Sequence, residues 1–417
     1  MKIVIVGAGI GGLATALSLK RAGFEDIKVY ERAPELRPLG VGINLLPHAV
    51  RELTELGLRD RLSALGTAPQ ALQYYNRFGQ LIWSEPRGTA AGYRWPQFSV
   101  HRGRLQMMLA EAVIESCGSD VLRLGHHLDA VKFGDGRAQA VFDCDGETVT
   151  EDADVLIGAD GIHSAVRRTF HPNEGAPIWN GLTLWRGTAR VPAFLNGRTM
   201  IMAGDDQLKF VAYPLSEIGD DGAMTVNFIA EQRTDGSRKE TVDWNRAVAI
   251  PPLADLFREW NFSWLDVPSV IASADEILEY PMVDRDPLDH WTHGRITLLG
   301  DAAHAMYPNG SNGASQAILD ARTLAYHVAT AESPDDALAR FEADRRPPTT
   351  ALVAANRRQG PEQVMAIARE RAPHGFDKVH DVIPETELRA IASEYKKAAG
   401  FDPEILNTRD SLTPAAR

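Results

Sequence analysis

The chain has 417 residues, of which 44% are hydrophobic and 24% charged, and 44 basic against 56 acidic side chains give a net charge of −12. At roughly 150 residues per domain, this length predicts two or three domains with a core that needs no disulfide staples. The acidic balance argues against a polyanion-binding protein, so no nucleic-acid partner is expected. Two cysteines exclude a disulfide framework and favour a cytoplasmic location.

The N-terminal apolar stretch is interpreted as folded structure rather than as a signal peptide. Glycines interrupt it at positions 7, 9, 11 and 12, and a second strand follows directly. No other window approaches the roughly 20 uninterrupted apolar residues that a membrane-spanning helix needs. We therefore expect no membrane span.

The first thirty residues predict a strand, a helix and a second strand. Residues 2–6 are a lysine followed by four β-branched apolar residues, a run typical of a strand buried on both faces of a parallel sheet. Apolar residues recur at helical spacing over 10–22, and Gly23 ends that helix. Residues 27–30 complete a βαβ unit, whose two strands are expected to be parallel.

A G-x-G-x-x-G motif, residues 7–12, lies between the first strand and the helix. Gly7 permits a tight turn, Gly9 lets a pyrophosphate reach backbone N–H groups at the helix N-terminus, and Gly12 allows close packing of helix and strand. Glu31, at the end of the second strand, is placed to accept ribose hydroxyls. The motif alone also fits a plain glycine-rich turn, but in this context it predicts a dinucleotide site.

After residue 30 the predicted pattern of helices and strands changes at about residue 179 and again at about residue 295. The elements expected next are helices over 50–65 and 104–116, a hairpin over 72–83, strands over 121–131 and 139–142, and a buried parallel strand over 154–157. Strand-like runs replace the alternation of strands and helices over 179–273, which indicates a separate sheet-built domain. A parallel-type strand at 295–299 and a long helix at 314–331 resume the first pattern. The first domain is therefore expected to be discontinuous.

Two later strand ends carry a glycine and an aspartate. The run 154–167 contains Gly158, Asp160 and Gly161 before a short helix. The run 294–304 ends its strand in Gly300-Asp301, and the residues that follow before the long helix include Pro308, Gly310 and Gly313.

The order and spacing of these three motifs resemble the single-component FAD-dependent aromatic hydroxylases, of the para-hydroxybenzoate and salicylate hydroxylase type, over roughly residues 1–350. The resemblance implies non-covalent FAD, NADH or NADPH as co-substrate, O2, and hydroxylation of an aromatic or heteroaromatic ring through a flavin C4a-hydroperoxide. Runs at 83–88 and 280–288 resemble the phenazine hydroxylases of this family. That closer likeness implies a phenazine-type carboxylate as candidate substrate, with or without decarboxylation.

The predicted fold is α/β, and α+β overall. We expect a Rossmann-like FAD-binding domain over 1–175 and 276–360, with a β-insertion at about 68–100. A mostly antiparallel β-sheet domain over 176–275 is expected to bind substrate, and a helical tail follows over 361–417.

Carried over residue by residue, the resemblance assigns the cofactor to Gly7, Gly9, Gly12, Glu31, Arg32, Gly42, Arg102, Asp160, Gly161, Arg167, Asp301, Pro308, Gly310 and Gly313. A helix beginning near Gly313 can direct its N-terminal dipole at the flavin, where negative charge develops on reduction. Two alternatives stay open: an ordinary strand-to-helix turn with a buried charge pair at 158–167, and a helix-capping role for Asp301.

The substrate candidates come from the sheet domain and from loops over the flavin: Leu46, Trp185, Arg186, Met202, Tyr213 and Pro308. Packing within the sheet's own core is the alternative role for each of them. Arg186 is the cation expected for a substrate carboxylate. His48 is interpreted as solvated.

No catalytic base is assigned, since an activated ring attacked by an electrophilic oxygen needs none. No metal site is expected, because the histidine pairs at 126–127 and at 290 and 293 lack carboxylate or cysteine partners at ligand spacing. The alternatives for function are a flavin-dependent epoxidase or other oxygenase of a secondary-metabolite pathway, and a non-catalytic flavin-binding redox sensor. A monomer or homodimer is expected.

Overall fold

The computed structural model describes residues 1–234 and 246–414. One half of the molecule, called the first half below, is built on a five-stranded parallel sheet in the order β21-β12-β1-β2-β8. The strands are β1 (Ile3–Val6), β2 (Ile27–Tyr30), β8 (Leu122–Arg123), β12 (Val155–Gly158) and β21 (Ile296–Leu298). The predicted βαβ unit and the late return of the chain to this sheet are confirmed.

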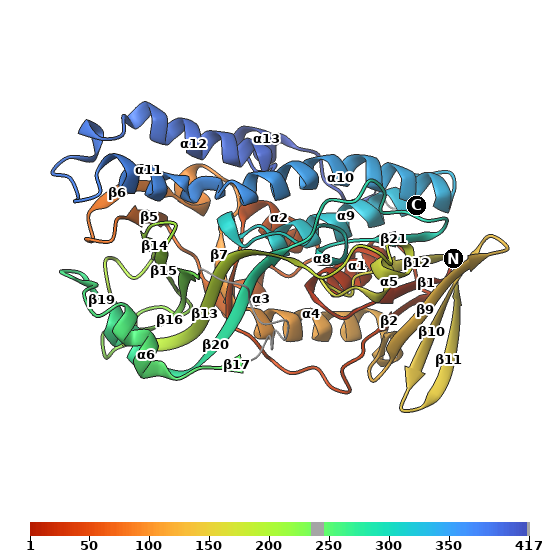
Figure 1. Ribbon diagram of the computed structural model, residues 1–417. Coiled ribbons are helices and arrows are strands. Elements are labelled where there is room, and N and C mark those ends of the chain that lie inside the picture. Colours follow the sequence, from red (N-terminus) through yellow and green to blue (C-terminus); the bar gives the residue numbers. More distant parts are fainter. Residues whose placement is uncertain (235–245, 415–417) are drawn as a thin grey trace.

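Different layers cover the two faces of this sheet. The helices α4 (Arg102–Cys117) and α9 (Gly313–Thr330) both pack on α1 (Ile10–Arg21), and α10 (Pro334–Arg357) packs on α9 (Figure 1). A three-stranded antiparallel sheet, β9 (His127–Gly134), β10 (Arg137–Cys144) and β11 (Glu147–Ala153), packs on the five-stranded sheet. Tyr30 of β2 and Phe142 of β10 stack with ring centroids 4.3 Å apart.

The helix expected over 50–65 is instead two helices, α2 (Pro47–Glu55) and α3 (Arg59–Leu65). Gly57 separates them at a φ of 82°, a conformation in which glycine carries no steric cost. A small sheet joins this region to α4. Its strands are β3 (Gly42–Leu45), β4 (Gly66–Thr67) and β7 (Phe98–His101).

The second half is an eight-stranded sheet in the order β17-β20-β13-β16-β15-β14-β5-β6. Its strands are β5 (Ala71–Tyr75), β6 (Leu81–Pro86), β13 (Ile178–Pro192), β14 (Thr199–Gly204), β15 (Leu208–Pro214), β16 (Ala223–Arg233), β17 (Arg246–Ala247) and β20 (Ala274–Asp284). Its pairs are antiparallel except β14 with β5, which run parallel.

The expected β-insertion at 68–100 needs correction. Its hairpin, β5 and β6, is the edge of the large sheet rather than an insertion within the first domain, because β5 pairs with β14 along residues 71–75 and 199–203. Leu72 and Tyr74 are buried beside Met200 and Met202. Since β20 also extends to Asp284, this sheet passes the expected boundary at 275. Local alternation predicts a hairpin but not the strand that it joins.

Short elements connect and cover the two sheets. They are α5 (Ala165–Phe170), α6 (Ile250–Leu256), β18 (Asn261–Phe262), β19 (Leu265–Asp266), α7 (Val267–Ala272) and α8 (Asp301–His304). None of the helices that the structure describes has both the length and the apolar character needed to span a membrane.

The C-terminal segment packs along both halves of the molecule. It contains α11 (Gln363–Arg371), α12 (Glu385–Ala398) and α13 (Pro403–Thr408), which run beside α10 along the top of the view in Figure 1. Met365 and Leu388 pack on the hairpin residues Leu72 and Tyr74. This segment therefore braces both the large sheet and, as shown below, the loop before α9.

Candidate active site

The glycine loop between β1 and α1 has the geometry of a phosphate cradle. A Cβ on Gly7, whose φ is 104°, would stand 2.4 Å from the Ala159 carbonyl oxygen, and one on Gly12 would stand 2.0 Å from that of Gly7. A Cβ on Gly9 would meet no atom of the described residues within 4 Å. Nor does any described side chain cap α1 at Gly9. The loop thus leaves an open approach to a helix N-terminus, which suits a pyrophosphate.

Glu31 braces this loop from the end of β2. Its Oε2 accepts a hydrogen bond from the Ala8 N–H at 2.9 Å, and its Oε1 accepts one from the Ala33 N–H at 3.0 Å. A carboxylate has about four acceptor sites, so two are left for ribose hydroxyls. Arg32 follows it and lies near His163, whose pKa is lowered first by burial and then by Arg285 and Arg32.

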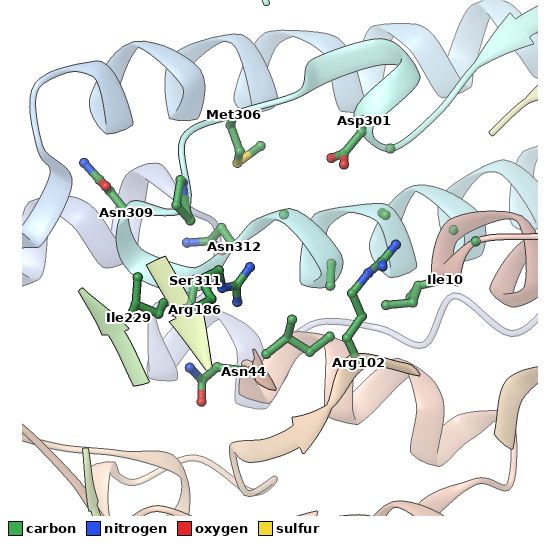
Figure 2. Close-up of a pocket in the computed structure, with 18 of the residues that line it drawn as sticks. Ile10, Asn44, Arg102, Arg186, Ile229, Asp301, Met306, Asn309, Ser311 and Asn312 are labelled. Carbon is green, nitrogen blue, oxygen red and sulfur yellow. The ribbon is translucent and has the colours of Figure 1, made fainter. Parts of the chain in front are cut away.

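A cavity of about 350 Å³ lies between the glycine loop, the turn at Gly300 and one face of the large sheet. Nine of the predicted site residues line it: Gly9, Arg102, Gly161, Arg186, Met202, Tyr213, Asp301, Pro308 and Gly313. Figure 2 shows the Asp301 carboxylate and the Arg102 guanidinium both directed into this space from opposite sides. The tertiary structure brings together residues that lie more than two hundred positions apart.

The N-terminus of α9 faces the same cavity. Asn312 is its N-cap residue, and no described side chain caps the helix there. Gly313 lines the cavity, and a Cβ on it would stand 4.0 Å from the Asp301 Oδ1. An uncapped helix start beside an aspartate and an arginine fits the charged and ring portions of a flavin dinucleotide.

The turn that carries Asp301 is held from behind by a buried ion cluster. Asp320 accepts hydrogen bonds from the Gly300 N–H at 2.9 Å and from Arg345 Nε at 2.7 Å, and its Oδ2 lies 2.6 Å from His304 Nε2. Burial alone would raise the pKa of Asp320, but His304, Arg345 and the Gly300 N–H together lower it to about 2. The cluster keeps Asp320 ionised and fixes the turn.

Asp160 and Arg167, for which a cofactor role is expected, are not among the residues that line this cavity. Asp160 Oδ2 accepts hydrogen bonds from the N–H groups of Ala165 at 2.7 Å and Val166 at 3.2 Å, so it caps α5. Burial raises its pKa. These contacts match the alternative of a strand-to-helix turn.

Arg167 is fully engaged within the protein. Its Nη1 donates to the carbonyl oxygens of Ala302 and Ala303 at 3.1 and 3.0 Å, its Nη2 donates to that of Asp286 at 2.8 Å, and it forms an ion pair with Glu174. The guanidinium therefore holds the residues after Asp301, and no donor is turned toward the cavity.

Leu46 and Trp185 also point elsewhere. Leu46 precedes α2 and packs in an apolar cluster with Tyr93 and Phe401. Trp185 donates from its indole to Glu279 Oε2 at 3.1 Å and packs on the opposite side of the sheet. Successive side chains of a strand alternate between faces, so a sheet that turns Arg186 into the cavity must turn Trp185 away.

Gly42 and Gly310 do not line the cavity themselves, but each contacts residues that border it. The Gly42 N–H donates to Asn227 Oδ1 at 2.7 Å, and its carbonyl oxygen accepts from Arg186 Nη2 at 2.8 Å. Gly310 has a φ of 74°, and a Cβ there would stand 2.0 Å from the Tyr395 hydroxyl. Both glycines allow close contact between elements that border the cavity.

The cavity is also lined by Ile43 and Asn44, which follow Gly42, and by Asn309, which lies between the expected residues Pro308 and Gly310. Other cavity-lining residues had no recognised signal in the sequence: Met200, Val211, Ile229, Glu231, Met306, Ser311, Asn312 and Glu362. Period-two alternation along β14 to β16 could have indicated those on the strands. Glu362 comes from the C-terminal segment, and no local pattern marks it. His48, expected to be solvated, is completely buried.

Comparisons with known proteins agree with this geometry. A family model described as an FAD binding domain matches residues 1–356. The chain is 44% identical over 411 residues to a phenazine 1,6-dicarboxylic acid hydroxylase from Lysobacter antibioticus, with 94% of this chain and 96% of that protein covered. It is 33% identical to a 3-amino-4-hydroxybenzoate 2-monooxygenase from Streptomyces cremeus, with 87% of each covered.

Solved structures share the fold at lower identity. Klebsiella pneumoniae HpxO, solved with FAD and uric acid, superposes with a TM-score of 0.70 at 23% identity, covering 98% of this chain and 95% of that one. CtdE, solved with FAD and a substrate, superposes with a TM-score of 0.74 at 19% identity, covering 96% and 99%. The chain therefore belongs to the FAD-dependent aromatic hydroxylases and is a flavoprotein monooxygenase.

Proposed function

We propose that this monooxygenase hydroxylates a fused heteroaromatic carboxylate of the phenazine type, using NADH or NADPH and O2. The observation that carries the proposal is the wall of the cavity formed by the large sheet. Apolar side chains of Met200, Met202, Val211 and Ile229 line it, and Arg186, opposite Ile229 in the sheet, supplies a cation. A flat apolar ring bearing one carboxylate complements such a wall.

The residues of the first half fit FAD. The N-terminus of α1 beside Gly9 suits the pyrophosphate, and Glu31 suits the ribose. Arg102, Asp301 and the start of α9 surround the space left for the flavin portion. When bound, FAD supplies hydride acceptance from the nicotinamide and activation of O2.

The protein's own contribution is to orient the substrate ring and to exclude water. Burial raises the pKa of the Tyr213 hydroxyl to about 12, although Arg186 opposes this shift, so Tyr213 stays protonated at neutral pH. The pair therefore presents hydrogen-bond donors to a carboxylate. No described residue in the cavity is required as a base, because an electron-rich ring reacts directly with an electrophilic oxygen.

The proposed setting is the cytoplasm, with the chain acting as a monomer or homodimer. Both cysteines, Cys117 and Cys144, are free thiols, which supports a reducing compartment. Size-exclusion chromatography with light scattering distinguishes the two assembly states from a larger oligomer.

The test is consumption of NADH and of NADPH by the FAD-loaded protein, with and without added aromatic acids. The panel contains phenazine-1-carboxylate, salicylate, 4-hydroxybenzoate and a quinolone carboxylate, and mass spectrometry identifies the products. We expect the phenazine to stimulate consumption several-fold, with a product that has gained one oxygen atom or has exchanged its carboxylate for a hydroxyl.

If only a single-ring acid stimulates NAD(P)H consumption, the fused-ring proposal is wrong and the substrate is a single-ring aromatic acid. Oxygen insertion at an isolated double bond would instead indicate an epoxidase. FAD binding without stimulated consumption by any compound would favour the sensor alternative.

A further inference from the structure

The cavity wall carries a regular pattern across two paired strands. Three directly opposed pairs of β15 and β16 include residues that line the cavity: Lys209 with Glu231, Val211 with Ile229, and Tyr213 with Asn227. The middle pair is apolar, and both outer pairs are polar. Side chains two positions apart share a face, so the wall changes from polar to apolar and back to polar along its length.

The two polar ends are far enough apart to contact opposite ends of one ligand. Asn227 and Glu231 are four residues apart on β16, which corresponds to about 13 Å at the rise of an extended strand. A ligand of two or three fused rings spans most of this distance. Its edges would therefore meet different side chains at the two ends.

One end presents hydrogen-bond donors. Arg186 pairs with Ile229 in the middle of the wall, but its guanidinium reaches toward the Asn227 end, where Nη2 donates to the carbonyl oxygen of Gly42 and the Gly42 N–H donates to Asn227. Arg186 lines the cavity, and its Nε is buried without a partner among the described residues. The Asn227 Nδ2 beside it is also buried and has no partner in the described part of the chain. Of these two unsatisfied donors, the Arg186 Nε belongs to a residue that lines the cavity and suits a ligand acceptor such as a carboxylate.

The other end presents carboxylates in excess. Lys209 Nζ lies 2.8 Å from Glu231 Oε2 and also forms an ion pair with Glu362. The three side chains are only 8%, 6% and 7% exposed. Two carboxylates offer about eight acceptor sites, whereas one ammonium supplies three donors, so acceptors remain for a ligand.

Glu231 and Glu362 also separate the main cavity from a second one of about 180 Å³, and both residues line both spaces. Lys209 lines the second cavity and not the first. The ammonium therefore stands behind the carboxylates, which face the ligand. Glu362 reaches this position from the turn Gly360–Glu362 that precedes α11.

We propose that Glu231 and Glu362 form a subsite that selects substrates carrying a hydrogen-bond donor or a cationic group at the ring edge opposite the carboxylate held by Arg186. The inference rests on the proposed function, which it deepens by specifying the far edge of the substrate. A second carboxylate at that edge would face two acidic side chains in a buried site, where like charges repel strongly. The subsite therefore disfavours the binding of aromatic dicarboxylates.

The experiment measures ligand dissociation constants for the oxidised, FAD-loaded full-length protein from the change in flavin absorbance. The ligands are phenazine-1-carboxylate, 6-aminophenazine-1-carboxylate and phenazine-1,6-dicarboxylate, which differ only at the far edge. We expect the amino compound to bind at least about tenfold more tightly than the dicarboxylate, and Glu231→Gln to reduce this ratio to about threefold or less.

Glu362→Gln provides an independent variant if Glu231→Gln fails to fold, and the same reduction is expected. Glu217→Gln is the matched control, because Glu217 is an exposed residue that pairs with Arg198 in the same sheet domain. Equal binding of the amino and dicarboxylate ligands by the wild type would overturn the subsite, as would an unchanged ratio in both folded glutamine variants. Failure of all three phenazines to bind or to stimulate NAD(P)H consumption would instead reject the proposed function itself.

Discussion

Arg186 Nη2 donates a hydrogen bond to the carbonyl oxygen of Gly42 at 2.8 Å and thereby joins the large sheet to β3 at the border of the cavity. The Nε of the same guanidinium has no hydrogen-bond partner in the part of the chain that the structure describes. Arg186 thus anchors the cavity wall and retains a donor for a ligand.

Replacing Arg186 by Met is expected to raise KM for a carboxylate substrate about ten- to a hundredfold, because a charge-assisted hydrogen bond contributes about 1.5–3 kcal/mol. Because the carboxylate is remote from the reacting carbon, kcat should change less. Steady-state kinetics with a carboxylate substrate and its decarboxylated analogue provide the measurement. Arg190→Met, at an exposed arginine that pairs with Asp221, is the control. An equal increase in KM for both compounds would contradict the assignment.

Gly9→Ala and Gly12→Ala should fail in different ways. A methyl group on Gly9 meets no described atom within 4 Å, so the variant should fold but bind FAD at least about tenfold more weakly, since the pyrophosphate loses its close approach. A methyl group on Gly12 would stand 2.0 Å from the Gly7 carbonyl oxygen and should prevent folding. Circular dichroism, and FAD titration followed by fluorescence, separate the two effects. A stable Gly12→Ala variant would show that the loop relaxes.

Tyr395→Phe should loosen the loop before α9. The Tyr395 hydroxyl donates to the Asn309 carbonyl oxygen at 2.9 Å and accepts from Asn312 Nδ2 at 2.9 Å. Its loss leaves buried polar groups unpaired, at a cost of about 1–3 kcal/mol in the free energy of unfolding.

Water entry through the loosened loop should also increase the fraction of NAD(P)H consumed without hydroxylated product. Urea unfolding and a comparison of cofactor consumed with product formed test both effects. Tyr326→Phe, at a half-buried tyrosine of α9, is the control. Unchanged coupling in Tyr395→Phe would show that the C-terminal segment does not seal the site.

His48 should make the folded state sensitive to acid. Burial, followed by the charges of Arg409 and Arg345, lowers its pKa to about 3. Between pH 6.5 and pH 3 the unfolded chain therefore binds a proton that the native chain does not, so the stability contributed by neutral His48 is lost as the pH falls through this window. The loss should reach about 2 kcal/mol by pH 5.

The measurement compares urea unfolding of the wild type and His48→Leu at pH 8 and pH 5. The difference in stability should move by about 2 kcal/mol in favour of the variant at pH 5. His127→Gln, at an exposed histidine of β9, should show no such change. A pH-independent difference for His48→Leu would mean that the native state takes up the proton at an ordinary pKa.

The sequence by itself determined the nucleotide-binding half of this protein. The roles of Gly7, Gly9 and Gly12 depend on steric limits that act within a few residues of each glycine, so their spacing specifies the turn directly. Burial on both faces likewise marks the strands of a parallel sheet in the local composition. The period-two pattern of the sheet domain also identified its strands, because that alternation is local.

Only the tertiary structure decided which side chains of these elements face the cavity and which distant residues contact them. From the sequence, the neighbours Trp185 and Arg186 are equally good candidates for the cavity. In the structure Arg186 lines the cavity, whereas Trp185 lies on the other face of the sheet and donates to Glu279. The sequence motif suggests that Arg167 binds the cofactor, but in the structure its guanidinium donates to the carbonyl oxygens of Ala302 and Ala303, which are distant in the sequence. Glu362 joins Glu231 across 131 positions, because packing of the C-terminal segment on the sheet places it there. Contacts between distant segments leave no periodic trace in the sequence, since each depends on the packing of whole elements.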